Sequence, residues 1–482
     1  MGGMKGVKVN SFNVGLYLGF FLFLVIILMP TPTGMTESAQ IVAGIAVLMA
    51  CWWISEAIPF AITALIPVCF FPVFGVMEVK ELTPAYANQI IFLFLSGFIF
   101  ALCIERWNLH KRIALYTIQL FGYSPHKILL GFMSATAFLS MWVSNTATVL
   151  MMIPVAVAVA TRLDPGSEND NQSTFTLLLM LGIAYSASIG GVATLIGTPP
   201  NAILAGMLEQ QSGISIGFFD WMLFAFPLAL IFLIITWYYL MFSMREVKSN
   251  DALISEKILG EEITKLNPLS QEEKQVIFVF SIVCFFWIVR GFIDIELFQR
   301  IKDSTIGMIG VIVLFILPAK NGTQRLMDWK TTRKVPWEIL ILFGGGFALA
   351  SGFEQTGLTH WLTTQFEFLQ GIPIVVVVFT IVLIVIFLTE ITSNTATATL
   401  LIPLMIALSP TLDLPAMWLA TAVAIATSYA FMLPVATPPN AIVYSTGRVS
   451  VKKMAKAGFL LNIVGSILIT TAIFILMPLI WP

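Results

Sequence analysis

The stretch Ser144-Asn145-Thr146-Ala147-Thr148 occurs twice in this chain, and its second copy is Ser393-Asn394-Thr395-Ala396-Thr397. A second string repeats downstream, as Thr198-Pro199-Pro200-Asn201-Ala202-Ile203 in the first half and Thr437-Pro438-Pro439-Asn440-Ala441-Ile442 in the second. Both halves carry the two strings in the same order, which chance does not explain. The chain therefore contains an internal repeat, and the fold must bring two related halves together.

The composition is that of a membrane protein. Hydrophobic residues make up 58% of the sequence and charged residues 11%, with a mean hydropathy of +0.93. A soluble protein cannot cover its surface with so few polar groups, so we predict an all-α polytopic membrane protein. The first apolar run follows Lys5 and Lys8, as in a signal peptide, but many more spans follow it, and we interpret it as the first membrane helix. The cysteines lie in apolar runs at unrelated spacings and are predicted to be small buried side chains.

Long apolar runs predict membrane helices, because about 20 apolar residues are needed to cross the hydrocarbon. Together with the interrupted segments, they predict an inverted-repeat transporter with about eleven membrane spans and two re-entrant helical hairpins. The runs lie near 14–30, 39–58, 60–77, 89–104, 220–243, 275–293, 304–318, 336–352 and 457–481.

Polar, helix-breaking strings interrupt four other apolar segments at matching places in the two halves. Segments 128–160 and 372–408 carry Ser-Asn-Thr in their interior, and segments 174–212 and 415–446 carry Thr-Pro-Pro-Asn. Two adjacent prolines remove amide donors and prevent a continuous helix. Freed backbone groups are tolerated at membrane depth only where they line a cavity, so such paired interruptions indicate a transporter's binding site. We expect two hairpins whose tips stop inside the membrane and two discontinuous helices.

The charge distribution predicts how the chain is oriented in a plasma membrane or bacterial inner membrane. With the amino terminus in the cytoplasm, only Lys80, Arg290, Arg300 and Lys302 of the 25 basic residues fall outside. An odd number of spans then separates the two copies, so the halves are inverted. The predicted parts are amino-terminal scaffold helices at 1–88, a first inverted repeat at 89–245, a cytoplasmic linker at 246–274, linking scaffold helices at 275–335 and a second inverted repeat at 336–482.

The repeated strings also predict a chemistry. Ser, Asn and Thr are neutral donors and acceptors, and half-helix amino termini add partial positive charge, so a hairpin tip can bind a carboxylate. Asn oxygens and unwound carbonyls suit a hard cation, which takes oxygen ligands. Two tips that face two broken helices therefore predict a pseudo-symmetric pocket for a dicarboxylate bound together with cations.

The paired Ser-Asn-Thr strings resemble those of the divalent-anion:sodium symporter family of sodium-coupled di- and tricarboxylate transporters. So does the run from Ser428 to Val443, Ser-Tyr-Ala-Phe-Met-Leu-Pro-Val-Ala-Thr-Pro-Pro-Asn-Ala-Ile-Val, and the resemblance covers nearly the whole chain. It implies sodium-coupled symport of C4 dicarboxylates such as succinate, malate or fumarate. We expect this symport to be electrogenic, because the hydroxyls and amides around both tips offer places for more than one sodium ion, and three sodium ions with a dianion carry net positive charge. The resemblance also implies a homodimer whose protomers each have a scaffold domain and a transport domain that moves by an elevator mechanism.

The same resemblance implies which residues bind the ions and the substrate. One sodium ion would be held by side chains of the first tip and by backbone of the first broken helix: Ser140, Ser144, Asn145 and Gly197. A second would be held by the corresponding groups of the second half: Thr389, Thr392, Asn394 and Ala436. The carboxylates would contact both tips and both broken helices: Ser144, Asn145, Thr198, Asn394, Thr395 and Thr437. Family members can carry Ser at the position of Thr198, where this chain keeps the hydroxyl and adds a methyl group.

Alternative interpretations remain. A single Ser-Asn-Thr in an apolar helix is more often an ordinary interhelical hydrogen bond, but its duplication beside the Pro-Pro breaks favours a site. The main alternative function is sodium-independent exchange of di- or tricarboxylates. We expect no enzyme, since the sequence shows no Ser/His/Asp set, paired aspartates or zinc spacing. We expect neither a channel nor a nucleic-acid partner.

Two carboxylates at membrane depth, Glu56 and Glu390, are functional candidates by default. Glu56 could equally lie at the cytoplasmic boundary. Glu390 is near enough to the second tip to tune a cation site, or it could make a structural hydrogen bond. Both alternatives stay open at the level of sequence.

Overall fold

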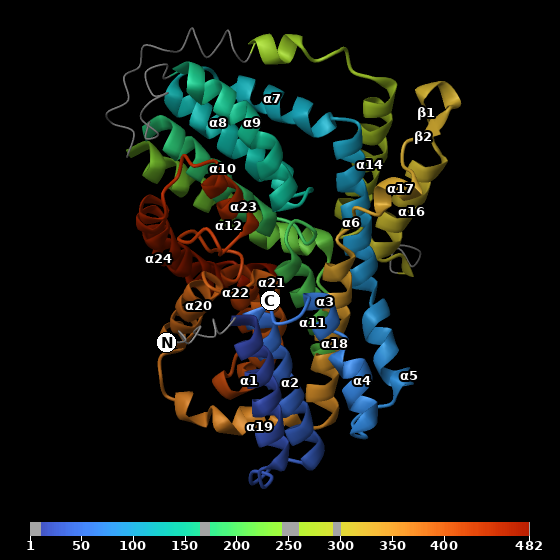
Figure 1. Cartoon of the computed structure of the whole chain (residues 1–482), viewed down its shortest axis with the longest axis vertical. Coiled ribbons are helices and arrows are strands. Elements are labelled where there is room, and N and C mark those ends of the chain that lie inside the picture. The colour runs from blue at the N-terminus through green and yellow to red at the C-terminus, as the bar shows by residue number, and fades with distance from the viewer. Residues whose placement is uncertain (1–10, 164–173, 243–259, 293–299, 482) are drawn as a thin grey trace, which may run out of the picture.

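The computed structural model of the protein describes residues 11–163, 174–242, 260–292 and 300–481. The predicted linker at 246–274 lies partly outside these ranges, and the first ten residues lie wholly outside them. Within the described ranges the chain is almost entirely helical, and two strands of two residues each form a small antiparallel sheet (Figure 1). The all-α prediction is confirmed.

The first half of the chain contains α1 Ser11–Leu28, α2 Glu37–Ser55, α3 Phe60–Thr63, α4 Ile66–Val73, α5 Val79–Leu82, η1 Thr83–Ala87, α6 Gln89–Arg106, α7 Leu109–Phe121, α8 Pro125–Ser140, α9 Asn145–Leu163, α10 Thr174–Val192, α11 Pro199–Ser212 and α12 Phe218–Phe242. The second half contains α14 Gln271–Val289, α16 Asp303–Ile316, β1 Pro318–Ala319, η3 Lys320–Gly322, β2 Gln324–Arg325, α17 Trp329–Thr332, α18 Trp337–Gln355, α19 Leu358–Gln365, η4 Glu367–Leu369, α20 Ile374–Thr389, α21 Asn394–Leu408, η5 Ser409–Leu412, α22 Ala416–Ala426, α23 Pro438–Ser445, α24 Val451–Ile475 and α25 Met477–Ile480.

Among the described residues, seven helical segments are long and apolar enough to cross a bilayer. The segments Leu358–Leu369 and Ile374–Thr389 make an eighth if they are counted together, although the chain bends by 115° between them. Several apolar helical segments are shorter: Val14–Leu28, Phe60–Val73 (α3 and α4 taken together), Asn145–Ala160, Asp303–Ile316 and Ala416–Ala426. This set of helices is that of a multi-pass membrane protein, and the number of eleven spans stays a prediction.

The apolar run at 60–77 does not form the single helix that the sequence predicted, because α3 ends at Thr63 and α4 begins at Ile66. The break frees backbone groups that need partners. The Ala64 carbonyl accepts a hydrogen bond from the Tyr86 hydroxyl at 2.6 Å. Helix α18 also approaches closely, so that a Cβ on Gly345 would lie 2.3 Å from the same carbonyl oxygen. Contacts from distant segments therefore stabilise a break that composition did not indicate.

Helices end on one side of each Ser-Asn-Thr string and begin on the other. Helix α8 ends at Ser140 and α9 begins at Asn145. In the second half, α20 ends at Thr389 and α21 begins at Asn394. We call the two intervening turns the first tip and the second tip.

Segments 174–212 and 415–446, which the sequence predicted to be discontinuous helices, are each interrupted, and the Thr-Pro-Pro-Asn string stands where the second helix of the segment begins. Both prolines stand in the first turn of α11 and of α23. Amide hydrogens of the first turn have no partner within the helix, so proline is tolerated there and its fixed φ suits the position. The unwound segments precede the strings, at 193–198 and at 427–437.

Helices of the two halves cross near the tips (Figure 1). Helix α9, which begins at Asn145, contacts α23, which follows Thr437. Helix α21, which begins at Asn394, contacts α11, which follows Thr198. Each helix that leaves a tip thus lies against the helix that follows the unwound segment of the other half.

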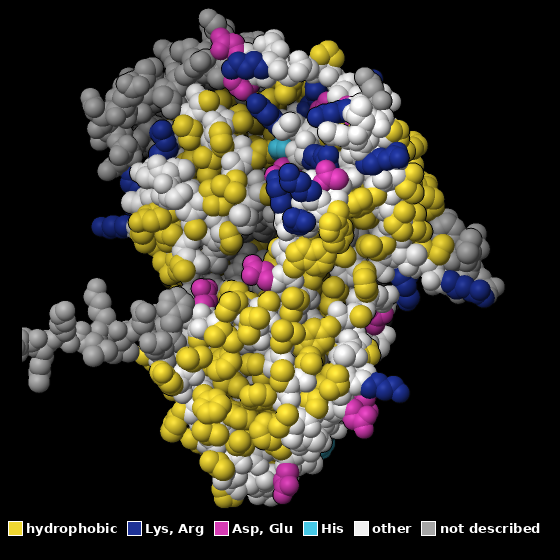
Figure 2. Space-filling view, turned by 45° about the vertical axis from the view of Figure 1, so that its right-hand side comes forward, with side chains coloured by type: hydrophobic (Ala, Val, Ile, Leu, Met, Phe, Trp, Pro, Cys, Tyr) yellow, Lys and Arg dark blue, Asp and Glu magenta, His cyan; other side chains and the backbone are white. Residues whose placement is uncertain are grey.

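Charged and apolar side chains are separated on the surface. On the face seen in Figure 2, Lys and Arg side chains gather toward the upper end, and hydrophobic side chains cover most of the lower half. An exposed apolar surface of this extent suits contact with lipid.

Candidate functional site

The first tip brings together three oxygen atoms from three helices, α8, α9 and α10. The hydroxyl of Ser140, at the end of α8, donates a hydrogen bond to Asn145 Oδ1 at 2.5 Å. It also lies 2.7 Å from the backbone oxygen of Ala187 in α10. A hydroxyl has a single hydrogen, so it cannot donate fully to both oxygens. The tip is therefore rich in oxygen lone pairs and poor in hydrogens.

Two glycines let the unwound segment at 193–198 reach this tip. A Cβ on Gly191 would lie 2.6 Å from Asn145 Oδ1 and 3.1 Å from the Gly197 backbone oxygen. A Cβ on Gly197 would in turn lie 2.3 Å from the Gly191 backbone oxygen. Real side chains are excluded at such distances. The structure thus gathers Ser140, Asn145 and Gly197, which were expected to share a sodium ion, around Gly191, which sequence analysis missed.

The second tip repeats the arrangement. The Thr389 hydroxyl donates a hydrogen bond to Asn394 Oδ1 at 2.7 Å and lies 3.1 Å from the backbone oxygen of Thr427, directly after α22. Thr389 is fully buried, as is Ser140 in the first tip. Each tip therefore holds one hydroxyl, one Asn amide oxygen and one backbone carbonyl. A small hard cation prefers such neutral oxygen ligands.

The other residues expected at the second sodium position make different contacts. The Thr392 hydroxyl lies 2.9 Å from the Leu388 carbonyl and 2.8 Å from the Thr397 hydroxyl, so it links α20 and α21 on the two sides of the second tip. The Ala436 amide donates to the Leu433 carbonyl within the unwound segment. Hydrogen bonds thus join Thr389 to Asn394, and they do not join Thr392 or Ala436 to that pair.

The first-half residues expected to contact substrate differ in exposure. Ser144 is exposed, and its hydroxyl accepts a hydrogen bond from the Ala147 amide at 3.3 Å. It borders a cavity of about 430 Å³ that Glu105 and His110 also line. Thr198 is only 3% exposed and directly precedes α11. Ser144 is therefore open to solvent, whereas Thr198 is enclosed.

The second-half residues differ in the same way. Asn394 and Thr395 are half-buried at the start of α21. Thr437 is 3% exposed, and its hydroxyl accepts a hydrogen bond from the Asn440 amide at 3.2 Å. The helices that begin at or directly after these residues contact each other in two pairs, α21 with α11 and α9 with α23.

Two buried asparagines that sequence analysis gave no role support the unwound segments. Asn201 Nδ2 donates to the carbonyls of Val192 and Thr194 at 3.0 and 2.8 Å. Asn440 Nδ2 donates to two carbonyls of the segment 427–437, both at 3.1 Å. These carbonyls have left their helices and need donors. The signal for both residues was in the sequence, since the asparagine recurs with the prolines in each copy.

Glu390 makes the structural hydrogen bonds that the sequence left open. It is 3% exposed, and its oxygens accept hydrogen bonds from the amides of residues 431–433 at 2.7, 2.9 and 2.9 Å. A fourth comes from Asn462 Nδ2 in α24 at 2.7 Å. Glu390 thus fixes the second unwound segment to the second tip. Glu56, in contrast, is exposed at the end of α2, with a φ of 52°.

The first half has no such carboxylate, because Met141 stands at the position of Glu390. There the Thr194 hydroxyl donates a hydrogen bond to the Met141 backbone oxygen at 2.5 Å. Tip and unwound segment are thus joined in both halves, through a hydroxyl in the first and a carboxylate in the second.

Apolar helices that are interrupted at two oxygen-rich tips define a multi-pass membrane protein of the transporter class. The chain belongs to the family described as the sodium:sulfate symporter transmembrane region, the divalent-anion:sodium symporter family, which matches residues 11–481. This confirms the resemblance found in the sequence.

Individual relatives cover almost the whole chain. The chain is 41% identical over 481 residues to the sodium-dependent dicarboxylate transporter SdcS of Staphylococcus saprophyticus. The alignment covers 97% of this chain and 93% of the relative. It is 42% identical over 480 residues to SdcS of Staphylococcus aureus strain USA300, with 97% and 91% covered.

Two solved structures share the fold. MtrF of Neisseria gonorrhoeae, from a class of antimetabolite efflux pumps, has a TM-score of 0.57 at 12% identity, with 98% of this chain and 95% of MtrF covered. The YdaH transporter of Alcanivorax borkumensis has a TM-score of 0.55 at 12% identity, with 98% of each chain covered. At this identity the likeness concerns the fold alone.

Proposed function

We propose that this protein is a secondary active transporter that carries C4 dicarboxylates such as succinate, malate or fumarate together with sodium ions. The observation that carries the proposal is the repeated cluster of hydroxyl, Asn oxygen and backbone carbonyl, formed at Ser140 and Asn145 and again at Thr389 and Asn394. Relatives named sodium-dependent dicarboxylate transporters support it, since they match 97% of the chain.

The substrate would lie between the two tips. Helices α9 and α21 begin at Asn145 and Asn394, so their free amides and the partial positive charge of their amino termini are available to carboxylates there. One tip would hold each carboxylate, helped by neutral side chains of the tips and unwound segments: Ser144, Asn145, Thr198, Asn394, Thr395 and Thr437. Sodium ions in the oxygen clusters would offset the charge of the dianion without a buried Lys or Arg.

We propose that the hairpins and broken helices move together as an elevator-type transport domain of an inverted-repeat homodimer. The packing of α9 on α23 and of α11 on α21 ties the two halves of this domain together, and Glu390 ties α20 to α24 through Asn462. The amino terminus would be cytoplasmic, because this orientation leaves only four of the 25 basic residues outside.

Transport would be electrogenic. Moving each elementary charge through 100 mV is worth about 2.3 kcal/mol, so a negative cell interior opposes entry of a bare dianion. A dianion that enters with three or more sodium ions carries net positive charge, and the membrane potential then assists its uptake.

Uptake of labelled succinate into proteoliposomes tests these points. A fixed inward sodium gradient is combined with a potassium potential set by valinomycin, and uptake should rise as the interior is made more negative. Uptake that ignores the potential contradicts net positive coupling. Uptake that persists at full rate without sodium contradicts symport and establishes sodium-independent exchange, the second candidate function. Chemical conversion of the succinate would indicate an enzyme instead.

A further inference from the structure

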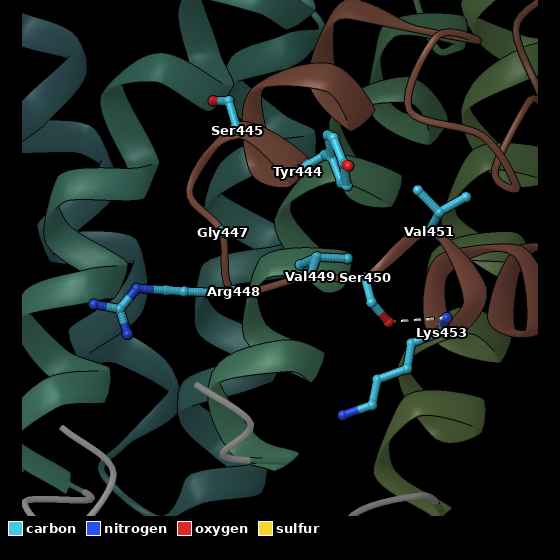
Figure 3. Close-up of a pocket in the computed structure, with 8 residues that line it drawn as sticks. All are labelled: Tyr444, Ser445, Gly447, Arg448, Val449, Ser450, Val451 and Lys453. Carbon is cyan, nitrogen blue, oxygen red and sulfur yellow. Dashed lines mark hydrogen bonds between the residues drawn. The ribbon is translucent and has the colours of Figure 1, made fainter. Parts of the chain in front are cut away.

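A cavity of about 490 Å³ lies between the end of α23 and the start of α24 (Figure 3). It is formed by the end of α23, the loop 446–450 and the first turn of α24: Tyr444, Ser445, Gly447, Arg448, Val449, Ser450, Val451 and Lys453. None of these residues is acidic. The proposed transport site does not use this cavity.

The charges of this region have a single sign. Segment 441–457 contains Arg448, Lys452, Lys453 and Lys456 and no Asp or Glu. In Figure 3, Arg448 extends to one side of the loop and Lys453 extends below it. Among the described residues, no side chain forms an ion pair with the Arg448 guanidinium. The cavity is therefore bordered by two cationic side chains, Arg448 and Lys453.

The start of α24 adds to the positive potential. The helix has 25 residues, and Ser450 is its N-cap, with a hydroxyl that accepts a hydrogen bond from the Lys453 amide at 3.4 Å (Figure 3). The amino terminus of a helix carries partial positive charge and offers amide donors to anions. An anion in the cavity would meet this terminus together with Arg448 and Lys453.

One exposed face of α24 continues from this cavity along the helix. Lys452 and Lys456 are exposed near its start. Further along, large apolar side chains recur at helical spacing with about half of their surface exposed: Phe459 50%, Leu460 47%, Ile467 51% and Ile475 58%. Val451–Ile480 is one of the candidate membrane spans. The face therefore combines a basic end with an apolar length that belongs in the hydrocarbon.

We propose that this cavity and the adjoining face of α24 bind an anionic phospholipid. Arg448 and Lys453 hold the phosphate, since guanidinium and ammonium groups are the usual phosphate partners. The acyl chains lie along Phe459, Leu460 and Ile467. A soluble anion could use the charges but not the apolar face, and basic clusters at the end of a membrane helix are the usual sites of anionic headgroups.

The location connects lipid binding to transport. Helix α23 has only eight residues, with Thr437 directly before it and Tyr444 and Ser445 of the cavity at its end. A lipid in this site would contact one end of the helix whose other end adjoins the second unwound segment.

The test measures lipid binding by the purified full-length protein, using native mass spectrometry. Phosphatidylglycerol and phosphatidylcholine with identical acyl chains are offered separately, and inorganic phosphate is offered as a soluble competitor. The wild type should retain phosphatidylglycerol in preference to phosphatidylcholine. The double variant Arg448→Gln, Lys453→Gln should bind phosphatidylglycerol about thirtyfold more weakly, with unchanged binding of phosphatidylcholine. Lys330→Gln, Lys334→Gln removes two exposed charges elsewhere and is the matched control.

Three results would overturn the proposal. The wild type could bind both lipids equally, the control pair could lose as much binding as the cavity pair, or inorganic phosphate could displace phosphatidylglycerol completely, which would define a site for a soluble anion. If the double variant does not fold, the preference of the wild type still decides. Arg448→Lys, which keeps the charge, should then retain phosphatidylglycerol.

Discussion

Thr389 donates a hydrogen bond to Asn394 Oδ1 across the second tip, with 2.7 Å between the two oxygens. The same hydroxyl faces the Thr427 backbone oxygen at 3.1 Å. Its single hydrogen cannot satisfy both acceptor oxygens, and a cation bound in this cluster would interact favourably with the remaining lone pairs. We expect Thr389→Val, which keeps the shape and removes the oxygen, to weaken apparent sodium affinity about tenfold or more, a loss of about 1.4 kcal/mol. Thr389→Ser keeps the oxygen and should remain close to wild type. Succinate uptake measured against sodium concentration compares the two, and equal sodium affinities would remove Thr389 from the site.

Asn145→Ala and Asn394→Ala should each abolish transport and leave a folded protein. Each change removes the side-chain amide of the first residue of α9 or α21, whose oxygen accepts a hydrogen bond from the tip hydroxyl. Neither asparagine side chain belongs to the hydrophobic core. Size-exclusion elution and thermal unfolding check the fold, and proteoliposome uptake checks activity. Uptake at the wild-type rate and affinity in either variant would refute the assignment of that tip.

Gly191→Ala should disable the first sodium position specifically. The added methyl group would lie 2.6 Å from Asn145 Oδ1, and a contact that short must displace the amide. Apparent sodium affinity should fall, with transport lost at low sodium before it is lost at high sodium. Gly260→Ala is the matched control, because a Cβ there meets nothing within 4 Å. Unchanged sodium dependence in Gly191→Ala would show that the first tip tolerates a displaced Asn145.

Glu390→Gln should destabilise the protein. The amides of residues 431 and 432 share one Glu390 oxygen and the amide of Leu433 bonds to the other, so in either orientation the new NH2 group would face at least one backbone N–H donor. The remaining bonds would lose the charge of their acceptor, and hydrogen bonds to a charged acceptor are worth about 1.5–3 kcal/mol each. Thermal unfolding of the purified protein should show a clear fall in midpoint. Glu56→Gln makes the same chemical change at an exposed site and should leave the midpoint unchanged. Equal midpoints for the two variants would contradict a structural role for Glu390.

Glu273→Gln should reduce stability in a pH-dependent manner. Glu273, in the first turn of α14, accepts hydrogen bonds from Arg112 at 2.7 and 3.1 Å and from the Ser270 amide at 2.8 Å. Burial tends to raise the pKa of Glu273, but these hydrogen bonds outweigh burial and hold the pKa below its ordinary value of 4.5. A lowered pKa in the folded state gives stability that is present above the ordinary value and is lost as the pH falls through the folded value.

The difference in unfolding midpoint between wild type and Glu273→Gln should accordingly be largest near pH 7 and shrink below pH 4.5. Ion pairs with most of their surface buried are costly to break, and here the side chains of Arg112 and Glu273 are 12% and 7% exposed. A difference that stays constant down to pH 3 would show that the charge of Glu273 contributes nothing.

The sequence predicted those features that depend on local strings and their duplication. Ser-Asn-Thr marked the ends of helices in both halves, because short polar side chains cap a helix better than they continue it. Ser140 and Thr389 were expected beside Asn145 and Asn394, and hydrogen bonds join each pair. Membership of the family followed from the same strings.

Features that depend on distant partners could not be predicted. Glu390 bonds to Asn462, and the break at Ala64 is supported by Tyr86 and Gly345, all from other helices. Hydropathy measures only how apolar a run is, so it cannot show whether neighbours will satisfy a broken backbone. The prolines marked the two interrupted segments but not the exact position of the break, because proline is tolerated in the first turn of the helix that follows it.

Met141 occupies in the first copy the place that Glu390 occupies in the second. The two copies are therefore no longer interchangeable. Methionine at position 390, the residue of the first copy, would set a thioether against the three backbone amides that now bond to Glu390 and would leave them without an acceptor. Glutamate at position 141, the residue of the second copy, would bury an additional carboxylate near Thr194, which now donates to a neutral carbonyl. The residue that joins tip and unwound segment in one half therefore cannot serve in the other.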